Sequence, residues 1–514
     1  MNQISGMKLM KIDFKGTSEK DWKEADSEFL ARLKQTPLPS ASSVWEGNWE
    51  SASYTNYSSI DGQALCEIPL FGSDEIDVVV RKARAAISGP SSWSKMHPND
   101  RKKLLLNFHD LIVEASDDLS LLDCIDVGKP FQIAKAVDVG SAARSLEWFA
   151  ELGDKIYGEV APTNNIDIIT SEPLGVVAAI VPWNYPLMIA AWKFAPILAA
   201  GNAVILKPAE QSPLSAMKLA EIAKSANLPD GVFNVVTGDG PTTGNILSSH
   251  QGVDAVAFTG STETGKLVIK SANEKRLKPV SLECGGKSPA ILFADCDLQK
   301  AVSLIAAGVF YNAGQSCNAP TRILVQEEVS EDAIELIKKE ASKFMPNNPM
   351  AKDTAVGAVL DREQYEKISK IVTSSVSAGA NVEFGGIERM FEDTGGYYMS
   401  PTILTSVTPE HPAFQEEIFG PVIPITTFKD VDEAIELANN SRYGLWANVF
   451  TKNMDYAMRC GKEIEAGTVA LNVTFGGDIT TPFGGYKDSG IGRDRSHHAL
   501  MKYTNIKHIS FNQS

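Results

Sequence analysis

The sequence has no closely spaced cysteine pair and no histidine at a position where a catalytic residue would be expected. Its six cysteines are scattered, with no CxxC pair and no spacing typical of a zinc site. A chain of 514 residues with no apolar signal segment is expected to keep these thiols reduced. None of its seven histidines ends an apolar run. These absences argue against a disulfide framework, a metal site and a papain-like cysteine–histidine pair.

A positive charge excess and long apolar runs are also missing. The formal net charge is −16, so the surface on average repels nucleic-acid phosphates. No run approaches the ~20 apolar residues that cross a bilayer. We therefore expect no nucleic-acid partner, no membrane span and, by default, a cytoplasmic location.

Helix-like and strand-like segments alternate along most of the chain. Apolar residues at intervals of three and four predict helices between 74 and 152. Continuous apolar runs then follow at 175–182, 202–208 and 255–260, with helix-like segments between them. This pattern predicts a doubly wound parallel sheet, which binds ligands at the carboxyl ends of its strands. A second alternation from residue 288 onward predicts a second α/β domain.

Three polar residues are candidates for chemistry. Cys317 lies among small and polar residues in "YNAGQSCNAP", Glu283 ends the apolar run of "VSLECGGKSP", and Asn184 follows another in "VPWNYP". A nucleophilic thiol needs a base and a donor for a developing oxyanion. Taken singly, each residue is also explained as a core thiol, a turn carboxylate or a turn amide.

Seven motifs carry a resemblance to a known family. They are "VPWNYP", "KPAEQSP", "FTGST", "LECGGKSP", "GQSCNAPTR", "EEIFGPV" and "PFGGYKDSGIGR". Their order, and the 34 positions from Glu283 to Cys317, resemble the aldehyde dehydrogenase superfamily from about Asp61 to the C-terminus.

The resemblance implies a domain plan. It consists of an N-terminal extension (1–40), a Rossmann-type NAD-binding domain (41–153 and 174–285), a second α/β catalytic domain (286–485) and a β oligomerisation arm (154–173 and 495–514). A homodimer or homotetramer is expected, and no metal.

The resemblance also implies a chemical role for each candidate. Cys317 would attack an aldehyde to give a thiohemiacetal and then a thioester. Asn184 and the backbone N–H of Cys317 would hold the oxyanion, and Glu283 would activate the hydrolytic water. The product would be a carboxylic acid.

For the cofactor, NAD is favoured over NADP. Lys207 and Glu210 match contacts to the adenosine ribose, and a carboxylate at this place would repel a 2′-phosphate. Gly260 and Ser261 end a predicted strand and begin a helix, where free N–H groups can hold a phosphate, although a tight turn explains them equally well. The other matching cofactor residues are Trp183, Glu417 and Phe419.

The substrate is predicted from weaker features. Tyr185, Trp192 and Tyr311 match positions lining the aldehyde tunnel. The stretch beginning "GGDITTPFGGYKDSGIGR" resembles enzymes acting on amino-aldehydes, including γ-glutamyl-γ-aminobutyraldehyde dehydrogenases of polyamine breakdown. Asp478 in this stretch could pair with a substrate amine or be an ordinary loop carboxylate.

Some alternatives remain open. A broad-specificity, aliphatic or betaine aldehyde dehydrogenase fits the same motifs, as does a non-catalytic structural relative. A CoA-acylating or purely esterolytic enzyme is disfavoured by Glu283 and by the intact cofactor motifs. Cys284 departs from the leucine usual in this family, and it could loosen Glu283 or form a disulfide with Cys317, or be a tolerated core substitution.

Overall fold

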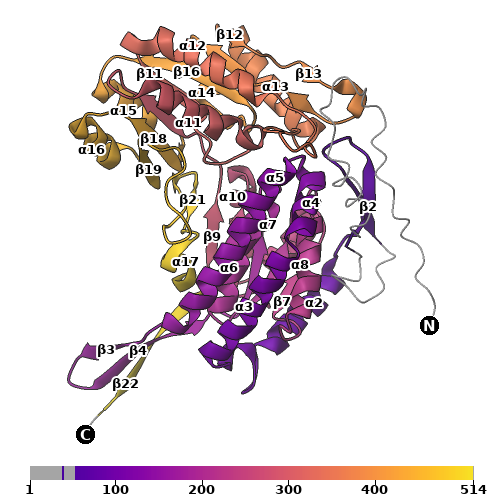
Figure 1. Cartoon of the computed structure of the whole chain (residues 1–514). Coiled ribbons are helices and arrows are strands. Elements are labelled where there is room, and N and C mark those ends of the chain that lie inside the picture. The colour runs from indigo at the N-terminus through magenta and orange to yellow at the C-terminus, as the bar shows by residue number, and fades with distance from the viewer. Residues whose placement is uncertain (1–37, 40–51, 513–514) are drawn as a thin grey trace.

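The structure is a computed structural model that describes residues 38–39 and 52–512. Nearly all of the predicted N-terminal extension therefore lies outside the described residues. Figure 1 shows a sheet with its helices in indigo to magenta, a second sheet with its helices in orange to yellow above it, and an arm at the lower left that carries the C-terminus.

The first sheet has six strands in the order β21-β9-β8-β5-β6-β7. Five are parallel and only β21 is antiparallel. From β5 the chain first adds β6 and β7 on one side, and then returns to add β8 and β9 on the other. This reversal is the switch point at which doubly wound sheets bind dinucleotides, so the predicted Rossmann-type fold is confirmed. The strands are β5 (Val176–Ile180), β6 (Ala203–Lys207), β7 (Phe233–Val235), β8 (Ala255–Thr259), β9 (Val280–Glu283) and β21 (Gly490–Ile491).

Strand β5 shows why this sheet is buried on both faces. All five of its residues are buried, and successive side chains point to opposite sides. Val177 and Ala179 pack into a core with helices α3 (Pro98–Glu114), α6 (Gly140–Leu152) and α7 (Pro186–Ala199). Val176 and Ala178 pack into a core on the opposite face with helices α2 (Ser73–Ala86) and α10 (Thr262–Ala272).

The second sheet has seven strands in the order β12-β15-β16-β11-β10-β18-β19. Only the edge strand β12 is antiparallel to its neighbour. Its strands are β10 (Pro289–Leu292), β11 (Arg322–Gln326), β12 (Asn381–Phe384), β15 (Thr402–Thr405), β16 (Val422–Phe428), β18 (Trp446–Phe450) and β19 (Thr468–Leu471). Its main helices are α11 (Leu298–Phe310), α12 (Ser330–Ala341), α13 (Arg362–Ser377), α15 (Val431–Asn439) and α16 (Met454–Glu463).

Shorter elements complete the fold. The predicted helical stretch that stops at Gly128 consists of two helices meeting at Ala115, and Gly128 ends the second with a φ of 74°. The further helices are α4 (Ser116–Val127), α5 (Phe131–Ile133), α8 (Leu214–Ser225), α9 (Asn245–Ser249), α14 (Pro412–Gln415) and α17 (Ser496–Met501), and a π-helix (Ala134–Val139) lies between α5 and α6. Three two-stranded sheets are also present. They pair β1 (Ser53–Tyr57) with β2 (Ala64–Pro69), β13 (Arg389–Met390) with β14 (Tyr398–Met399), and β17 (Tyr443–Gly444) with β20 (Tyr486–Lys487).

The arm is a three-stranded antiparallel sheet in the order β22-β4-β3. It is formed by β3 (Glu159–Pro162), β4 (Ile166–Pro173) and β22 (Thr504–Phe511). Val160 and Ile506 on this sheet are 72% and 77% exposed. Its part in oligomerisation stays a prediction, as do the domain limits. Strand β21 already returns to the first sheet just beyond the predicted end of the catalytic domain.

Among the helices that the structure describes, none is both long and apolar enough to cross a membrane.

Arg322, the first residue of β11, joins the second sheet to the segment that follows Glu283. Its buried guanidinium donates to the carbonyl of Lys287 at 2.7 Å and to those of Leu437 and Ala438, in the last turn of α15, at 2.9 and 2.7 Å. A cation at this end of a helix satisfies carbonyls that have no partner within the helix.

We expect Arg322→Met to lower the free energy of unfolding by about 3 kcal/mol or more, because several buried carbonyls lose their donor. Thermal unfolding followed by circular dichroism should show a melting temperature lower by several degrees. The control is Arg362→Met, since that side chain is exposed and pairs only with Glu366 at the surface. Equal shifts in the two variants would contradict this role.

Candidate active site

The loop that carries Cys317 begins with an unusual turn. After α11, Asn312 and Ala313 have φ values of 51° and 53°, which residues other than glycine rarely adopt. The turn is held by its side chains, because Gln315 Nε2 donates to the Asn312 carbonyl at 3.1 Å and Gln315 Oε1 accepts from the N–H of Leu360 at 2.9 Å. The side chain of Gln315 thus holds the backbone that leads to Cys317, through one bond within the loop and one to Leu360.

Asn184 reaches the same loop from the first sheet. It lies in the connection between β5 and α7, and its Nδ2 donates to the carbonyl of Gln315 at 3.0 Å. Asn312 Nδ2 donates back to the carbonyl of Asn184 at 3.1 Å. Asn184 is buried and, unlike Cys317, is not one of the residues that line the cavity described below. The structure therefore brings the side chain of Asn184 to Gln315, which lies two residues before Cys317 in the same loop.

Glu283 lies at the carboxyl end of β9 and lines the same cavity as Cys317. It is only 3% exposed, and neither carboxyl oxygen has a hydrogen-bond partner among the described residues. A Cβ on Gly484 would lie 2.6 Å from Glu283 Oε1, so this close approach requires glycine. A buried carboxyl without a partner is available to bind water or another polar group.

A buried ion cluster lies behind Glu283. Asp494 accepts from Lys193 Nζ at 2.6 Å and from Lys502 Nζ at 2.7 Å. Burial acts to raise the pKa of Asp494, but the two lysines outweigh it and lower that pKa. For Glu283, burial raises the pKa well above its usual value, and the charge of Asp494 adds to this effect. Glu283 is therefore biased toward its protonated form and is a stronger base than an ordinary glutamate.

The sequence analysis missed this cluster. Lys193 offered a signal, because it is the one charged residue in the apolar helix α7. Its partners are some 300 positions away and could not be identified from the sequence.

The thiol of Cys317 is held in its neutral form. Burial raises the pKa of Cys317, and the charges of Glu417 and Glu283 raise it further. Cys284 is also a free thiol, so no disulfide with Cys317 is present. Its sulfur packs against Gly265 of α10 in a buried core, and Cys284 also lines the cavity of Cys317. This packing favours the interpretation of Cys284 as a core substitution.

The cavity in front of Cys317 has a volume of 510 Å³, a size typical of small-molecule sites. All four predicted tunnel residues line it, namely Tyr185, Trp192, Tyr311 and Asp478. The rings of Tyr185 and Tyr311 stack with centroids 6.2 Å apart.

Further residues of the cavity wall were missed in the sequence. Phe475 packs edge-on against Tyr311, and Phe483 packs against Trp192. Arg144 and Arg495 also lie on the wall. Asp478 is exposed, and it accepts from the N–H and hydroxyl of Thr480 at 2.9 and 2.6 Å. Those bonds lower the pKa of Asp478, so it is both a turn carboxylate and a negative charge on the wall.

The predicted cofactor residues gather at the carboxyl ends of the first sheet. Trp183 follows β5, Lys207 ends β6, and Gly260 with Ser261 follows β8. Ser261 caps α10 by accepting from the N–H of Thr264 at 3.1 Å. The buried hydroxyl of Thr259, at the end of β8, has no partner among the described residues. Free helix N–H groups beside an unpaired hydroxyl suit a phosphate-bearing ligand.

Two cofactor residues come from the part of the chain that builds the second sheet. Glu417 accepts from the N–H of Gly286 at 2.9 Å, and a Cβ on Gly285 would lie 2.4 Å from its carboxylate. Phe419 packs edge-on against Trp183, with ring centroids 5.3 Å apart. These contacts place both residues beside Glu283 and the end of β5.

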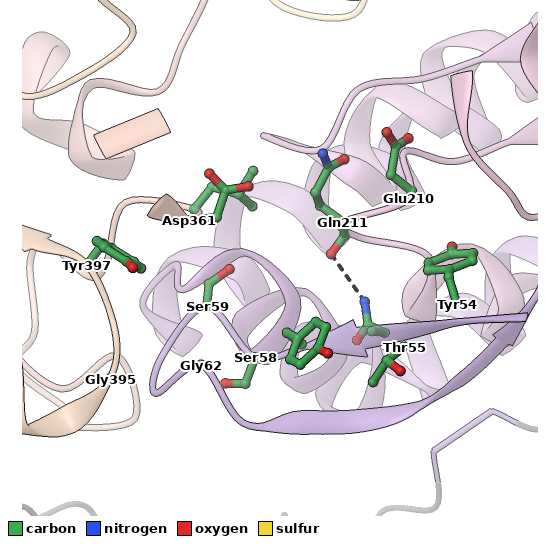
Figure 2. A pocket seen from close by; sticks show the side chains of 13 residues that line it. Tyr54, Thr55, Ser58, Ser59, Gly62, Glu210, Gln211, Asp361, Gly395 and Tyr397 are labelled. Atoms are coloured by element: carbon green, nitrogen blue, oxygen red, sulfur yellow. Dashed lines mark hydrogen bonds between the residues drawn. The ribbon is translucent and has the colours of Figure 1, made fainter. Parts of the chain in front are cut away.

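Lys207 and Glu210 lie together after β6, with Nζ and the carboxylate 4.0 Å apart. Burial lowers the pKa of Lys207, whereas Glu210 acts to raise it. Glu210 and Gln211 also line a second pocket of 440 Å³ beneath the β1–β2 hairpin. Figure 2 shows this pocket, with Asn56 Nδ2 donating to the carbonyl of Gln211 at 3.3 Å. Glu210 is therefore accessible to a ligand.

Among the residues that the structure describes, no group of three His, Cys, Asp or Glu side chains is placed to hold a metal ion.

Comparison with known proteins gives consistent matches over nearly the whole chain. Residues 46–509 match the aldehyde dehydrogenase family. The NADP/NAD-dependent aldehyde dehydrogenase PuuC of Escherichia coli (strain K12) is 43% identical over 463 residues, covering 90% of this chain and 92% of its own length. Retinal dehydrogenase 2 of Homo sapiens is 39% identical over 91% of this chain and 90% of its own length.

Solved structures agree with these matches. The γ-glutamyl-γ-aminobutyraldehyde dehydrogenase of Burkholderia cenocepacia J2315 has a TM-score of 0.91 and 41% identity, covering 94% of this chain and 98% of its own. The indole-3-acetaldehyde dehydrogenase AldA of P. syringae, in complex with NAD⁺ and IAA, has a TM-score of 0.92 and 38% identity, covering 95% and 100%.

The raised pKa of Cys317 can be tested by alkylation with iodoacetamide, because only the thiolate reacts. We expect the rate at Cys317 to rise about tenfold per pH unit from pH 7 to 9, since this range lies below its pKa. Mass spectrometry of the Cys317 peptide measures the rate. N-acetylcysteine is the reference, and its rate levels off above about pH 8.5. A rate at Cys317 that does not change with pH would contradict the prediction.

Proposed function

Because the chain belongs to the aldehyde dehydrogenase family, we propose that it oxidises an amino-aldehyde to the carboxylic acid with NAD, using Cys317 as the nucleophile. The substrate proposed is γ-glutamyl-γ-aminobutyraldehyde or a related polyamine-derived aldehyde. The observation that carries the proposal is the shared cavity, in which the Cys317 thiol and the unpaired, buried carboxyl of Glu283 face one space.

The first step follows from the states of these two groups. The thiol must lose its proton before the sulfur attacks, because its pKa is raised. Glu283, whose own pKa is raised, is a stronger base than an ordinary glutamate and is the proposed acceptor of that proton. As the sulfur–carbon bond forms, the carbonyl electrons move to oxygen. The amide of Asn184 and the backbone N–H of Cys317 are the proposed donors to this oxyanion, each worth on the order of 3 kcal/mol.

The chemistry that bound NAD would supply is to accept the hydride from the aldehyde carbon. The residues that would hold it are Trp183, Lys207, Glu210, Gly260, Ser261, Glu417 and Phe419. The accessible carboxylate of Glu210 supports NAD over NADP, because it would repel a 2′-phosphate.

Hydrolysis of the thioester completes the reaction. After the proton from the first step has passed to solvent, Glu283 takes a proton from water and the new carbon–oxygen bond forms. The carbon–sulfur bond then breaks to release the acid, and the proton on Glu283 returns to the sulfur to restore the thiol. The charge of Asp494 raises the pKa of Glu283 and so strengthens it as a base, whereas Lys193 and Lys502 act in the opposite direction.

Support for an amino-aldehyde comes from the tunnel. Aromatic faces of Tyr185, Trp192 and Tyr311 suit both an alkyl chain and an ammonium group. The buried hydroxyl of Tyr311 has no partner among the described residues and is free to bind a polar chain. Asp478 offers a negative charge. One of the similar proteins, the Burkholderia enzyme, is a γ-glutamyl-γ-aminobutyraldehyde dehydrogenase, which supports this substrate class.

We also propose a homodimer or homotetramer. The apolar side chains exposed on the arm, including Val160 and Ile506, support this assembly because such residues are normally covered. A cytoplasmic location stays a prediction.

A panel of aldehydes tests the proposed function through NADH formation at 340 nm. We expect γ-glutamyl-γ-aminobutyraldehyde and γ-aminobutyraldehyde to exceed neutral aliphatic aldehydes by about tenfold or more in kcat/KM, a difference that a few polar contacts supply. Cys317→Ala should form no NADH with any of them. Betaine aldehyde or a neutral aldehyde as the best substrate would contradict the amino-aldehyde assignment, and activity in Cys317→Ala would contradict the catalytic one.

Glu283→Gln tests the base. The amide has the same shape but accepts no proton, so steady-state turnover should fall about 100-fold or more. Wild-type turnover should rise with pH through the raised pKa of Glu283, because the base acts only when deprotonated, and this rise should vanish in the variant. Stopped-flow absorbance measures the loss of turnover, and pH profiles of the wild type and the variant measure the rise with pH. Glu340→Gln, at a buried glutamate of α12 outside the cavity, is the control and should keep wild-type kinetics.

A further inference from the structure

The cavity wall holds two arginines that the proposed mechanism does not use. Arg144 lies on α6, and Arg495 immediately precedes α17. They come from segments about 350 positions apart and meet at one cavity with Trp192, Phe475 and Asp478. A cavity for neutral aldehydes would have no need of two guanidinium groups.

Arg495 is held in place with part of its hydrogen-bonding capacity unused. Its Nε and Nη2 donate to the carbonyl and hydroxyl of Thr481 at 3.2 and 2.6 Å. The guanidinium lies over the rings of Trp192 and Phe483, at 5.5 and 5.6 Å from their centroids. Its Nη1 makes no hydrogen bond within the described residues. This arrangement fixes the cation before any ligand arrives and leaves donors for one.

Arg144 is free to adapt to a ligand. Its side chain is exposed, and it has no ion pair or hydrogen bond with any described residue. It lies three positions after Ser141 on the helix, so both face the cavity.

The negative groups of the wall do not neutralise these cations. Burial holds Glu283 toward its neutral form, and Asp494 is already paired with two lysines. Asp478 is bound by Thr480, and it forms no ion pair with Arg144 or Arg495 in the described structure. Asp478 interacts with Arg495 through its charge, but one carboxylate does not balance two guanidinium groups, so positive charge remains to attract an anionic ligand.

We propose that Arg495 and Arg144 bind a carboxylate carried by the aldehyde at the end remote from its carbonyl. Asp478 is then placed to bind an ammonium group of the same ligand. The substrate class is an aldehyde that ends in an α-amino-acid head group, which carries both charges. This inference rests on the proposed function and deepens it, because it ranks γ-glutamyl-γ-aminobutyraldehyde above γ-aminobutyraldehyde, which has no carboxylate.

The test compares two matched substrates, γ-glutamyl-γ-aminobutyraldehyde and its analogue with the α-carboxylate replaced by a carboxamide. The wild-type enzyme should favour the carboxylate by about tenfold or more in kcat/KM, as expected for charge-assisted hydrogen bonds. Arg144→Gln and Arg495→Gln should each reduce this preference, and the double variant should remove it. Their kcat/KM for the carboxamide should fall by less than their kcat/KM for the carboxylate, because the carboxamide has no charge to lose.

Arg144→Gln guards against a folding defect, since Arg144 has no partner to lose. Arg495→Lys keeps the charge but not the planar fork, and it should retain part of the preference. Arg81→Gln, at an exposed arginine of α2 outside the cavity, should leave the preference unchanged.

A binding measurement gives a readout that does not need turnover. The N-propylamide of γ-glutamate has the head group but no aldehyde. Calorimetry should detect its binding to the wild-type protein and about tenfold weaker binding to Arg144→Gln.

Equal kcat/KM for the two wild-type substrates, or equal losses for both in the variants, would overturn this inference while the proposed function stands. Absence of NADH formation with every aldehyde would overturn both.

Discussion

Two hydrogen bonds between loops of different sheets hold the site together. Asn184, after β5, donates to the carbonyl of Gln315, and Asn312 donates back to the carbonyl of Asn184. Because Gln315 is two residues from Cys317, these bonds fix the position of the thiol relative to the carboxyl ends of the first sheet. Glu283 and several of the predicted cofactor residues, including Lys207 and Ser261, lie at those same ends. The nucleophile is thus supplied by one half of the chain and the base by the other, while the predicted cofactor residues come from both.

Electrostatics in this site depend on burial more than on contact distance. Glu283 has no hydrogen-bond partner among the described residues, and its pKa is raised because a charge there is poorly solvated. Asp494 is equally buried, yet two lysines keep it ionised. Two carboxyl groups close to one another therefore take opposite states, one as a fixed charge and the other as a proton acceptor.

Cys317 and Glu283 share their cavity with the aromatic rings of Tyr185, Tyr311 and Trp192. Arg144, Arg495 and Asp478 supply charges of both signs at the same wall. An extended substrate can present its aldehyde to the thiol while its polar end is bound by these charges. Specificity and chemistry are then set by separate residues.

The sequence by itself determined the fold class and the family, because both depend on local patterns. Apolar runs such as that of β5 predict buried parallel strands, and residues that follow such strands, including Glu283 and Ser261, must lie at one edge of the sheet. Glu283 and Asn184 could be selected as candidates for that reason, and Cys317 because of its small and polar neighbours. Only the tertiary structure decided that Lys193 contacts Asp494 and that Arg144 and Arg495 line one cavity. Those meetings depend on how two sheets pack over hundreds of positions, and periodicity and turn chemistry carry no information about contacts at that range.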